Sequence, residues 1–176
     1  MKQPESGHDA RGRKNLLLFL IVLTSFINPF MGAAVNIALP DMAKEFSMNT
    51  VMMGWVSMSF LLASVAVLLP IGKIADITGR KKIFLIGNGI FTLASVLCAV
   101  SVNSYMLISS RVIQGIGGAM MFGTGTAMIT SAFPPEQRGR ALGINVSAVY
   151  LGLTLAPLLG GFLTDLFGWR SNFWLN

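Results

Sequence analysis

The stretch GKIADITGRKK, residues 72–82, gathers five charged side chains into eleven positions of a chain in which only 11% of residues are charged. One carboxylate, Asp76, lies among the cations Lys73, Arg80, Lys81 and Lys82. Opposite charges a few residues apart form exposed ion pairs that are weak enough to exchange partners. Two interpretations stay open: a solvated connection between buried helices, or a working part of the molecule in which Asp76 and the cations act together.

Arg111 is a second candidate, because it is the only charge between Ile83 and Pro135. On insertion scales an arginine at the centre of a membrane span is unfavourable by about 3 kcal/mol. Small residues follow it at four-residue steps, which form one face of a helix: Gly115, Ala119, Gly123 and Ala127. Such a face packs closely on another helix. We expect Arg111 to point into a bundle, although its long stem would also let it snorkel to the headgroups.

The sequence lacks the residues that disulfides, metal sites and acid–base catalysis require. The chain has one cysteine, Cys98, and one histidine, His8, which excludes a disulfide framework and a cluster of Cys and His metal ligands. No carboxylate lies in the uncharged runs, so paired acids for catalysis are also missing. The sequence predicts no metal, no cofactor and no enzymatic activity.

The elements that carry these residues are long and apolar. Hydrophobic residues make up 53% of the 176, and five uncharged runs each exceed the ~20 residues that a membrane span requires. We predict an all-α membrane protein with spans at 15–39, 51–75, 83–102, 105–132 and 139–163. Residues 1–14 form a polar tail, and 171–176 read as the start of a sixth span, so that 15–176 is a bundle truncated in that span.

The net charge of +6 is distributed unevenly between the predicted connections. Ten cations lie in the tail, the second connection and the fourth, whereas only Lys44 and Arg170 lie in the others. This is the positive-inside pattern, which predicts a cytoplasmic N-terminus in a multi-pass protein of the cell membrane. The same distribution argues against a nucleic-acid partner.

A degenerate repeat relates the two halves of the chain. Gly72, Asp76, Gly79 and Lys81 recur with the same spacing, 89 residues later, as Gly161, Asp165, Gly168 and Arg170. The copies lie three spans apart and therefore on opposite faces of the membrane. Inverted three-span repeats are how many secondary transporters build matching halves.

Two helix faces predict packing or a cavity. The fifth span carries Ala148, Gly152, Ala156 and Gly160 at four-residue steps, and we expect it to pack on the fourth span. The first span carries a polar stripe of Thr24, Asn28, Gly32 and Asn36. Lipid-facing amides are costly, so Asn28 and Asn36 should face the interior. There they would line a substrate cavity or bond to neighbouring spans.

These motifs resemble those of the major facilitator superfamily, and of its drug:proton antiporter family, especially the fourteen-span branch. GKIADITGRKK is similar to the signature between the second and third spans, and LISSRVIQGIGGA, residues 107–119, to that of the fourth. The fifth span fits the antiporter signature at Gly143, Gly152, Pro157, Gly160 and Gly161, with Ala156 replacing one glycine. The resemblance implies the N-terminal bundle of the facilitator fold.

The resemblance also implies roles for individual residues. A cytoplasmic latch would be formed by Gly72, Asp76, Gly79, Arg80, Lys81, Glu136 and Arg138. Proton coupling would involve Arg111 and Gln114. The fifth helix, which Pro157 should bend, would seal the cavity against leak. The antiporter pattern has an acidic residue nine positions before Pro40, and this chain has Met31 there.

The sequence thus predicts a multidrug-type proton antiporter that exports small amphipathic or cationic compounds. Its partners would be the small-molecule substrate, protons, the lipid bilayer and a C-terminal bundle that this chain lacks. A fragment of this kind should be inactive alone. The alternative is a small helical membrane scaffold or regulatory subunit that acts by helix packing without transport.

Overall fold

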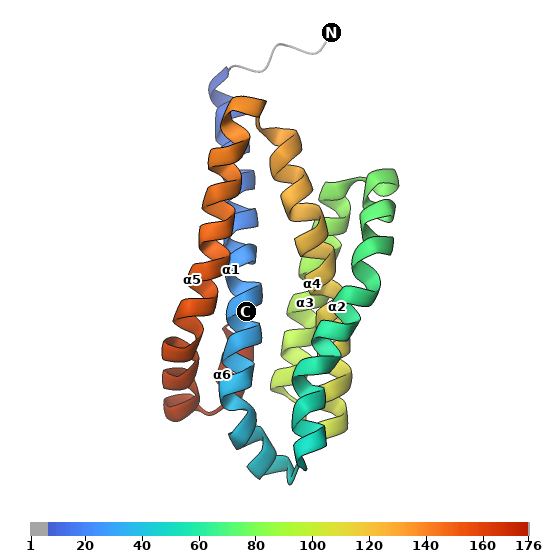
Figure 1. Cartoon of the computed structure of the whole chain (residues 1–176), viewed down its shortest axis with the longest axis vertical. Coiled ribbons are helices and arrows are strands. Elements are labelled where there is room, and N and C mark those ends of the chain that lie inside the picture. The colour runs from blue at the N-terminus through green and yellow to red at the C-terminus, as the bar shows by residue number, and fades with distance from the viewer. Residues whose placement is uncertain (1–6, 176) are drawn as a thin grey trace.

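A computed structural model of the chain describes residues 7–175 and consists of helices and short connections (Figure 1). Their bounds are α1 Gly7–Phe46, α2 Thr50–Thr78, α3 Arg80–Ala99, α4 Ser104–Ala132, α5 Pro135–Phe167 and α6 Arg170–Trp174. By length and composition, α1 to α5 can each cross a membrane. The prediction of five spans in an all-α membrane protein is confirmed.

The first helix differs most from its predicted bounds. It begins at Gly7, inside the predicted polar tail, and continues to Phe46, past the predicted end at 39. Residues 1–6 of that tail lie outside the described residues. Pro29 and Pro40 both lie inside this helix, so neither proline ends it. The predicted bounds were too short because the absence of charge marks only the apolar part of a helix, whereas the helical backbone continues into the polar residues on both sides.

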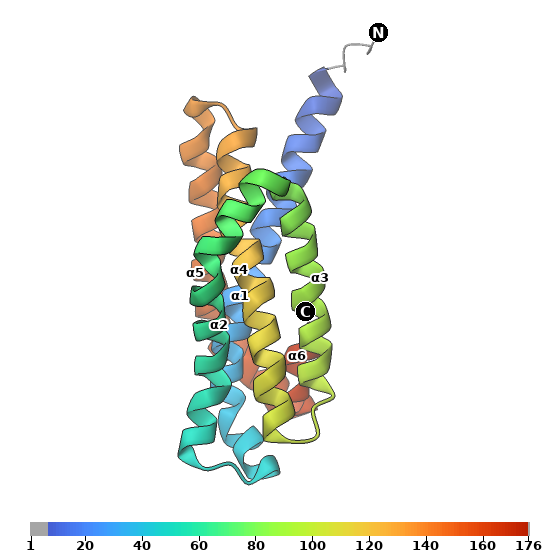
Figure 2. The ribbon, with the colours of Figure 1, turned by 90° about the vertical axis from the view of Figure 1, so that its right-hand side faces the viewer.

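The helices form two groups that lie side by side. Helix α5 runs along α1, and α2 and α3 pack against α4; short α6 lies beside α1 and α3 (Figures 1 and 2). We call the end that holds the α2–α3 and α4–α5 turns the basic end. The opposite end holds the connections that follow α1, α3 and α5.

Two turns of the predicted repeat share their backbone geometry. Gly79 separates α2 from α3 with φ +102°, and Gly168 follows α5 with φ +78°. Each glycine donates its N–H, over 2.9 Å, to the carbonyl of the residue four before it. Residues other than glycine rarely adopt such φ values. The 89-residue spacing therefore marks two helix ends that require glycine for the same reason.

Buried side chains fill the interior of each group, and large apolar side chains cover much of the outside. Cys98 is fully buried in the core. Exposed residues such as Leu69 on α2 and Phe162 on α5 suit a surface that faces hydrocarbon. Trp169, which its type would place at a lipid interface, is instead buried at the opposite end.

Candidate functional site

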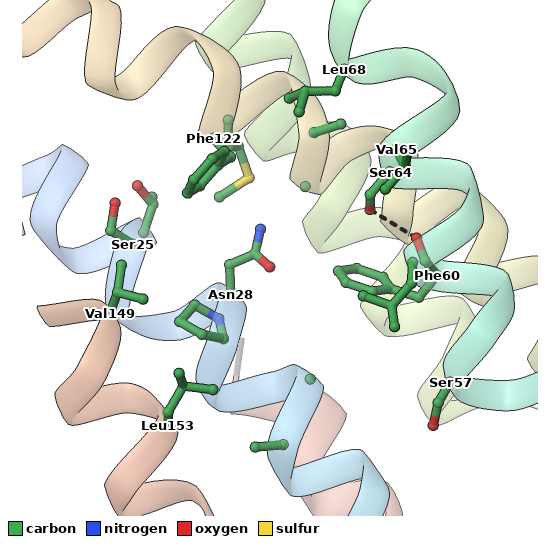
Figure 3. Close-up of a pocket in the computed structure, with 18 of the residues that line it drawn as sticks. Ser25, Asn28, Ser57, Phe60, Ser64, Val65, Leu68, Phe122, Val149 and Leu153 are labelled. Carbon is green, nitrogen blue, oxygen red and sulfur yellow. Dashed lines mark hydrogen bonds between the residues drawn. The ribbon is translucent and has the colours of Figure 1, made fainter. Parts of the chain in front are cut away.

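A cavity of about 440 Å³ lies between the α1–α5 and α2–α4 pairs. Figure 3 shows its walls, with Ser25 and Asn28 on α1 facing Phe60 and Ser64 on α2. Helix α4 contributes Phe122, and α5 contributes Val149 and Leu153. The volume lies within the range of small-molecule sites, roughly 300–1,000 Å³. The prediction that the polar stripe of the first span lines a cavity agrees with this geometry.

Polar groups interrupt the apolar walls at a few places. The Ser64 hydroxyl is bonded to the carbonyl oxygens of Phe60 at 2.8 Å and Gly115 at 2.9 Å (Figure 3). The Ser57 hydroxyl donates to the Asn36 amide oxygen and so joins α2 to α1. The Asn28 amide points into the open space and bonds to no other described residue. Asn36 is thus engaged in packing, whereas Asn28 is available to a ligand.

Arg111 is buried in the wall of this cavity, with 1% of its surface exposed. Its Nε donates to the carbonyl oxygen of Val56 over 3.2 Å, and its Nη1 donates to the side chain of Gln114 over 2.6 Å. The Phe60 ring lies against the guanidinium, 4.4 Å from its carbon to the ring centroid. Arg111 therefore points into the bundle, and snorkelling to the headgroups is excluded for this conformation.

The arginine belongs to a chain of bonds that crosses three helices. Gln114, also fully buried, donates from Nε2 to the Ser95 hydroxyl on α3 over 2.6 Å. These partners are all neutral. Among the described side chains, the carboxylates lie near helix ends, and none contacts Arg111. The guanidinium is held by dipoles and a ring face, which leaves its charge uncompensated.

Glycines allow the closest helix contacts. A Cβ added at Gly115 would lie 2.4 Å from the carbonyl oxygen of Phe60 and 3.1 Å from the Cβ of Ala63, both on α2. A Cβ added at Gly152 would lie 2.4 Å from the carbonyl oxygen of Phe26 on α1. The predicted packing of the fourth span on the fifth through these residues is wrong. Spacing identifies a face for close packing, but the partner depends on the fold.

The residues of the antiporter signature divide into two groups. Gly152 and Gly160 face α1, and a Cβ at Gly160 would lie 2.7 Å from that of Ala34. Gly143 has no atom within 4 Å of an added Cβ, Gly161 has only an ordinary contact, and Pro157 is exposed. Only part of the motif therefore contributes to helix packing within the described residues.

The predicted latch residues meet only in part at the basic end. Arg80 donates to one Asp76 oxygen from Nε at 3.0 Å and from Nη2 at 2.8 Å, and its Nη1 donates to the Ala127 carbonyl on α4 at 3.1 Å. Gly79 makes the turn between them, whereas Gly72 and Lys81 make no close contact there. Arg138 bonds to the Phe133 carbonyl, and Glu136 pairs with no described cation.

A second charged cluster, at the opposite end, was missed by the sequence interpretation. Glu45 accepts from both terminal nitrogens of Arg170, at 2.8 and 2.7 Å, and from the Trp169 indole at 2.7 Å. Arg170 also donates to the Ser101 carbonyl at 3.0 Å. We call these four residues the Glu45 cluster. The available signal was that the two opposite charges, far apart in sequence, were both predicted at one end.

Met31 occupies the position where the antiporter pattern has an acid. Its side chain is 1% exposed and belongs to the hydrophobic core rather than to the cavity wall. A carboxylate at this depth would require a partner that the neighbouring apolar side chains do not supply.

Comparison with known proteins agrees with the family resemblance of the sequence motifs. The family model described as Major Facilitator Superfamily matches residues 21–176. The riboflavin transporter RibZ of Clostridioides difficile is 35% identical over 93% of this chain and 36% of its own length. The multidrug resistance protein Stp of Mycobacterium tuberculosis is 36% identical over 90% and 28%. The methylenomycin A resistance protein of Bacillus subtilis is 32% identical over 100% and 38%.

A solved structure confirms the fold. The bacterial homologue of the human lysosomal transporter Spinster, inward-facing and occupied, superposes with a TM-score of 0.80 over 92% of this chain and 40% of its own, at 23% identity. This chain spans about a third of the length of the curated relatives it matches. The relatives are named as transporters and resistance proteins, in agreement with a non-enzymatic role. The family match, the five spans and the shared fold together establish that the chain belongs to the major facilitator superfamily.

Proposed function

We propose that this chain forms one helix bundle of a multidrug-type exporter of small amphipathic compounds. The observation that carries the proposal is the cavity between the two helix pairs, which is mostly apolar and has isolated amide and hydroxyl groups at its surface. Such a lining suits ligands of mixed polarity. Relatives named for multidrug and methylenomycin A resistance support export as the direction.

We further propose that export is coupled to protons through Arg111 and Gln114. The described spans contain no carboxylate in their interior that could carry the proton itself. The buried cation would instead respond to charge that enters or leaves the cavity, since charges interact strongly in a medium of low dielectric constant. Protons could then bind in a second bundle, consistent with relatives about three times as long as this chain.

The charged turn at the basic end would act as the latch of this transporter. Arg80 joins α2 and α4 through an exposed ion pair with Asp76 at the end of α2 and a half-buried hydrogen bond to a carbonyl of α4. Exposed ion pairs contribute at most about 1 kcal/mol, so they can exchange partners as the bundle moves. The remaining cations there, Lys81 and Lys82 among them, are exposed and suit lipid headgroups.

The proposed orientation puts the basic end in the cytoplasm, at the cell membrane. Single-cysteine labelling in a Cys98→Ala background tests it. An impermeant maleimide should modify Lys44→Cys in intact cells, because that side chain is 83% exposed at the opposite end. Gln137→Cys, exposed in the basic end, should react only after permeabilisation. Labelling in the reverse order would overturn the orientation.

Export is tested with the complete reading frame that encodes this chain, expressed in a bacterium that lacks its own efflux pumps. Accumulation of amphipathic dyes should fall when the protein is present and recover when the proton gradient is collapsed. Riboflavin belongs in the same assay as a second candidate cargo, because one relative is named as its transporter. A stably expressed protein that moves none of these compounds would favour the scaffold interpretation.

A further inference from the structure

The cavity has an unusual balance of charge for a site expected to accept cationic compounds. Among the described residues that line it, Arg111 is the one with an ionisable side chain, and none is acidic. An organic cation that entered would leave water without meeting a carboxylate from these helices. Burial of an unpaired charge is strongly unfavourable.

The positive charge of Arg111 lacks a counter-ion. Its Nε and Nη1 donate to neutral oxygens. A buried guanidinium without a carboxylate gains most from an anion brought close to it. The potential that Arg111 projects is only weakly screened, because the wall around it is apolar.

The part of the cavity near Arg111 is lined by Asn28, Gly118 and Phe60. A Cβ added at Gly118 would lie 2.9 Å from the Asn28 amide nitrogen and 3.4 Å from the Phe60 ring. The guanidinium of Arg111 lies against the same Phe60 ring, with its carbon 4.4 Å from the ring centroid. An amide donor on α1, an aromatic ring on α2 and a cation on α4 therefore lie around the same part of the cavity.

We propose that this part of the cavity selects amphipathic compounds with an aromatic body and an anionic group, and discriminates against cations. The inference rests on the proposed export function and narrows its predicted amphipathic or cationic cargo to one charge class. The anionic group accepts from Asn28 and lies in the field of Arg111. The aromatic body packs on Phe60 and Phe122.

Two dyes with the same xanthene ring system test the charge class. Fluorescein is anionic and rhodamine 123 is cationic at neutral pH. Fluorescence polarisation with the purified product of the complete reading frame, in lipid nanodiscs, measures binding without requiring transport. Fluorescein should bind about tenfold more tightly, a ratio that corresponds to about 1.4 kcal/mol. Arg111→Gln should bring the ratio near one, whereas Arg111→Lys, which keeps the charge, should preserve most of it.

Asn28→Asp provides a second test that does not disturb the buried network. It replaces an amide in the cavity with a carboxylate of nearly the same shape. The added negative charge should reverse the preference, so that rhodamine 123 binds more tightly than fluorescein. Gln137→Glu, the same chemical change at an exposed site, should leave the ratio unchanged. Equal or tighter binding of rhodamine 123 by the unmodified protein would overturn the charge selectivity and leave export standing. Binding of neither dye would count against the export function as well.

Discussion

In the α2–α4 pair, Gly115 of α4 lies against the carbonyl oxygen of Phe60; in the α1–α5 pair, Gly152 of α5 lies against that of Phe26. The repeat relates these contacts, because Phe26 precedes Gly115 by 89 residues and Ala63, which also contacts Gly115, precedes Gly152 by the same number. The contact is shared, but the glycine is on the opposite helix of each pair. The two halves of the repeat therefore share the close contact between two helices, but not the helix that carries the glycine.

The two pairs differ in charge. Arg111 on α4 anchors a chain of bonds from Val56 on α2 to Ser95 on α3. The residue 89 positions earlier is Val22, on α1. One pair therefore combines packing with a buried cation, whereas the other has packing without it. Substitutions that separate these two properties test the comparison.

The largest effect is expected from Gly115→Leu and Gly152→Leu. A Cβ alone would lie 2.4 Å from a backbone oxygen at both sites, so the helices must move apart. We expect each to lose about 3 kcal/mol of stability, the upper part of the range for overpacking. Melting of the solubilised protein measures it, with the exposed Ile113→Leu and Leu151→Ile as controls. A loss of stability from only one of the two substitutions would show that the two helix pairs do not depend equally on close packing.

Arg111→Val places the counterpart residue of α1 into α4. It leaves the Gln114 oxygen without its donor, which should cost about 2 kcal/mol, and it should abolish export. Val22→Ile is the control, because it adds one methylene at a half-buried site and should change stability by less than about 1 kcal/mol. Export and abundance are measured in the same cells. Normal export by Arg111→Val would show that the charge is dispensable and that the pairs are functionally alike.

Glu45→Gln tests whether the opposite end is held by charge. Three donors converge on Glu45, and two come from one guanidinium, so the amide should lower stability by about 1–2 kcal/mol. Asp41→Asn on the same helix is the control, since its contact with Lys44 is exposed and 3.9 Å long. Both variants are melted at low and high salt. A Glu45→Gln effect no larger than that of Asp41→Asn would reduce the Glu45 cluster to a surface contact.

The smallest effect on stability is expected from Asp76→Asn. Its bond to Arg80 is exposed and should contribute at most about 1 kcal/mol, yet export should fall because the latch loses its charge. Asp165→Asn, the counterpart in the repeat, pairs with no described cation and should leave export and melting unchanged. Equal export by Asp76→Asn and the unmodified protein would make this turn a topology signal only.

The sequence allowed prediction of properties that depend on one helix at a time. Uncharged length identified five spans, and the small-residue ladder beside Arg111 indicated its inward direction correctly. Neither pattern specified a partner helix, so the pairings of Gly115 and Gly152 were missed. Phe60 and Glu45 were also missed, since each matters through a contact with a residue at least fifty positions away. Such contacts follow from how the helices cross, which no local pattern encodes.

The turn at Gly79 also bears on how the chain enters a membrane. Helices α2 and α3 are separated by this single residue, so the end of α2 and the start of α3 stay next to each other. We therefore expect α2 and α3 to insert together as a helical hairpin, with the start of α2 and the end of α3 crossing the membrane first. In the proposed orientation, Arg80, Lys81 and Lys82 would stay on the cytoplasmic side, as the positive-inside rule favours. The glycine at this turn would thus make the helix pair α2–α3, rather than a single helix, the unit that enters the bilayer.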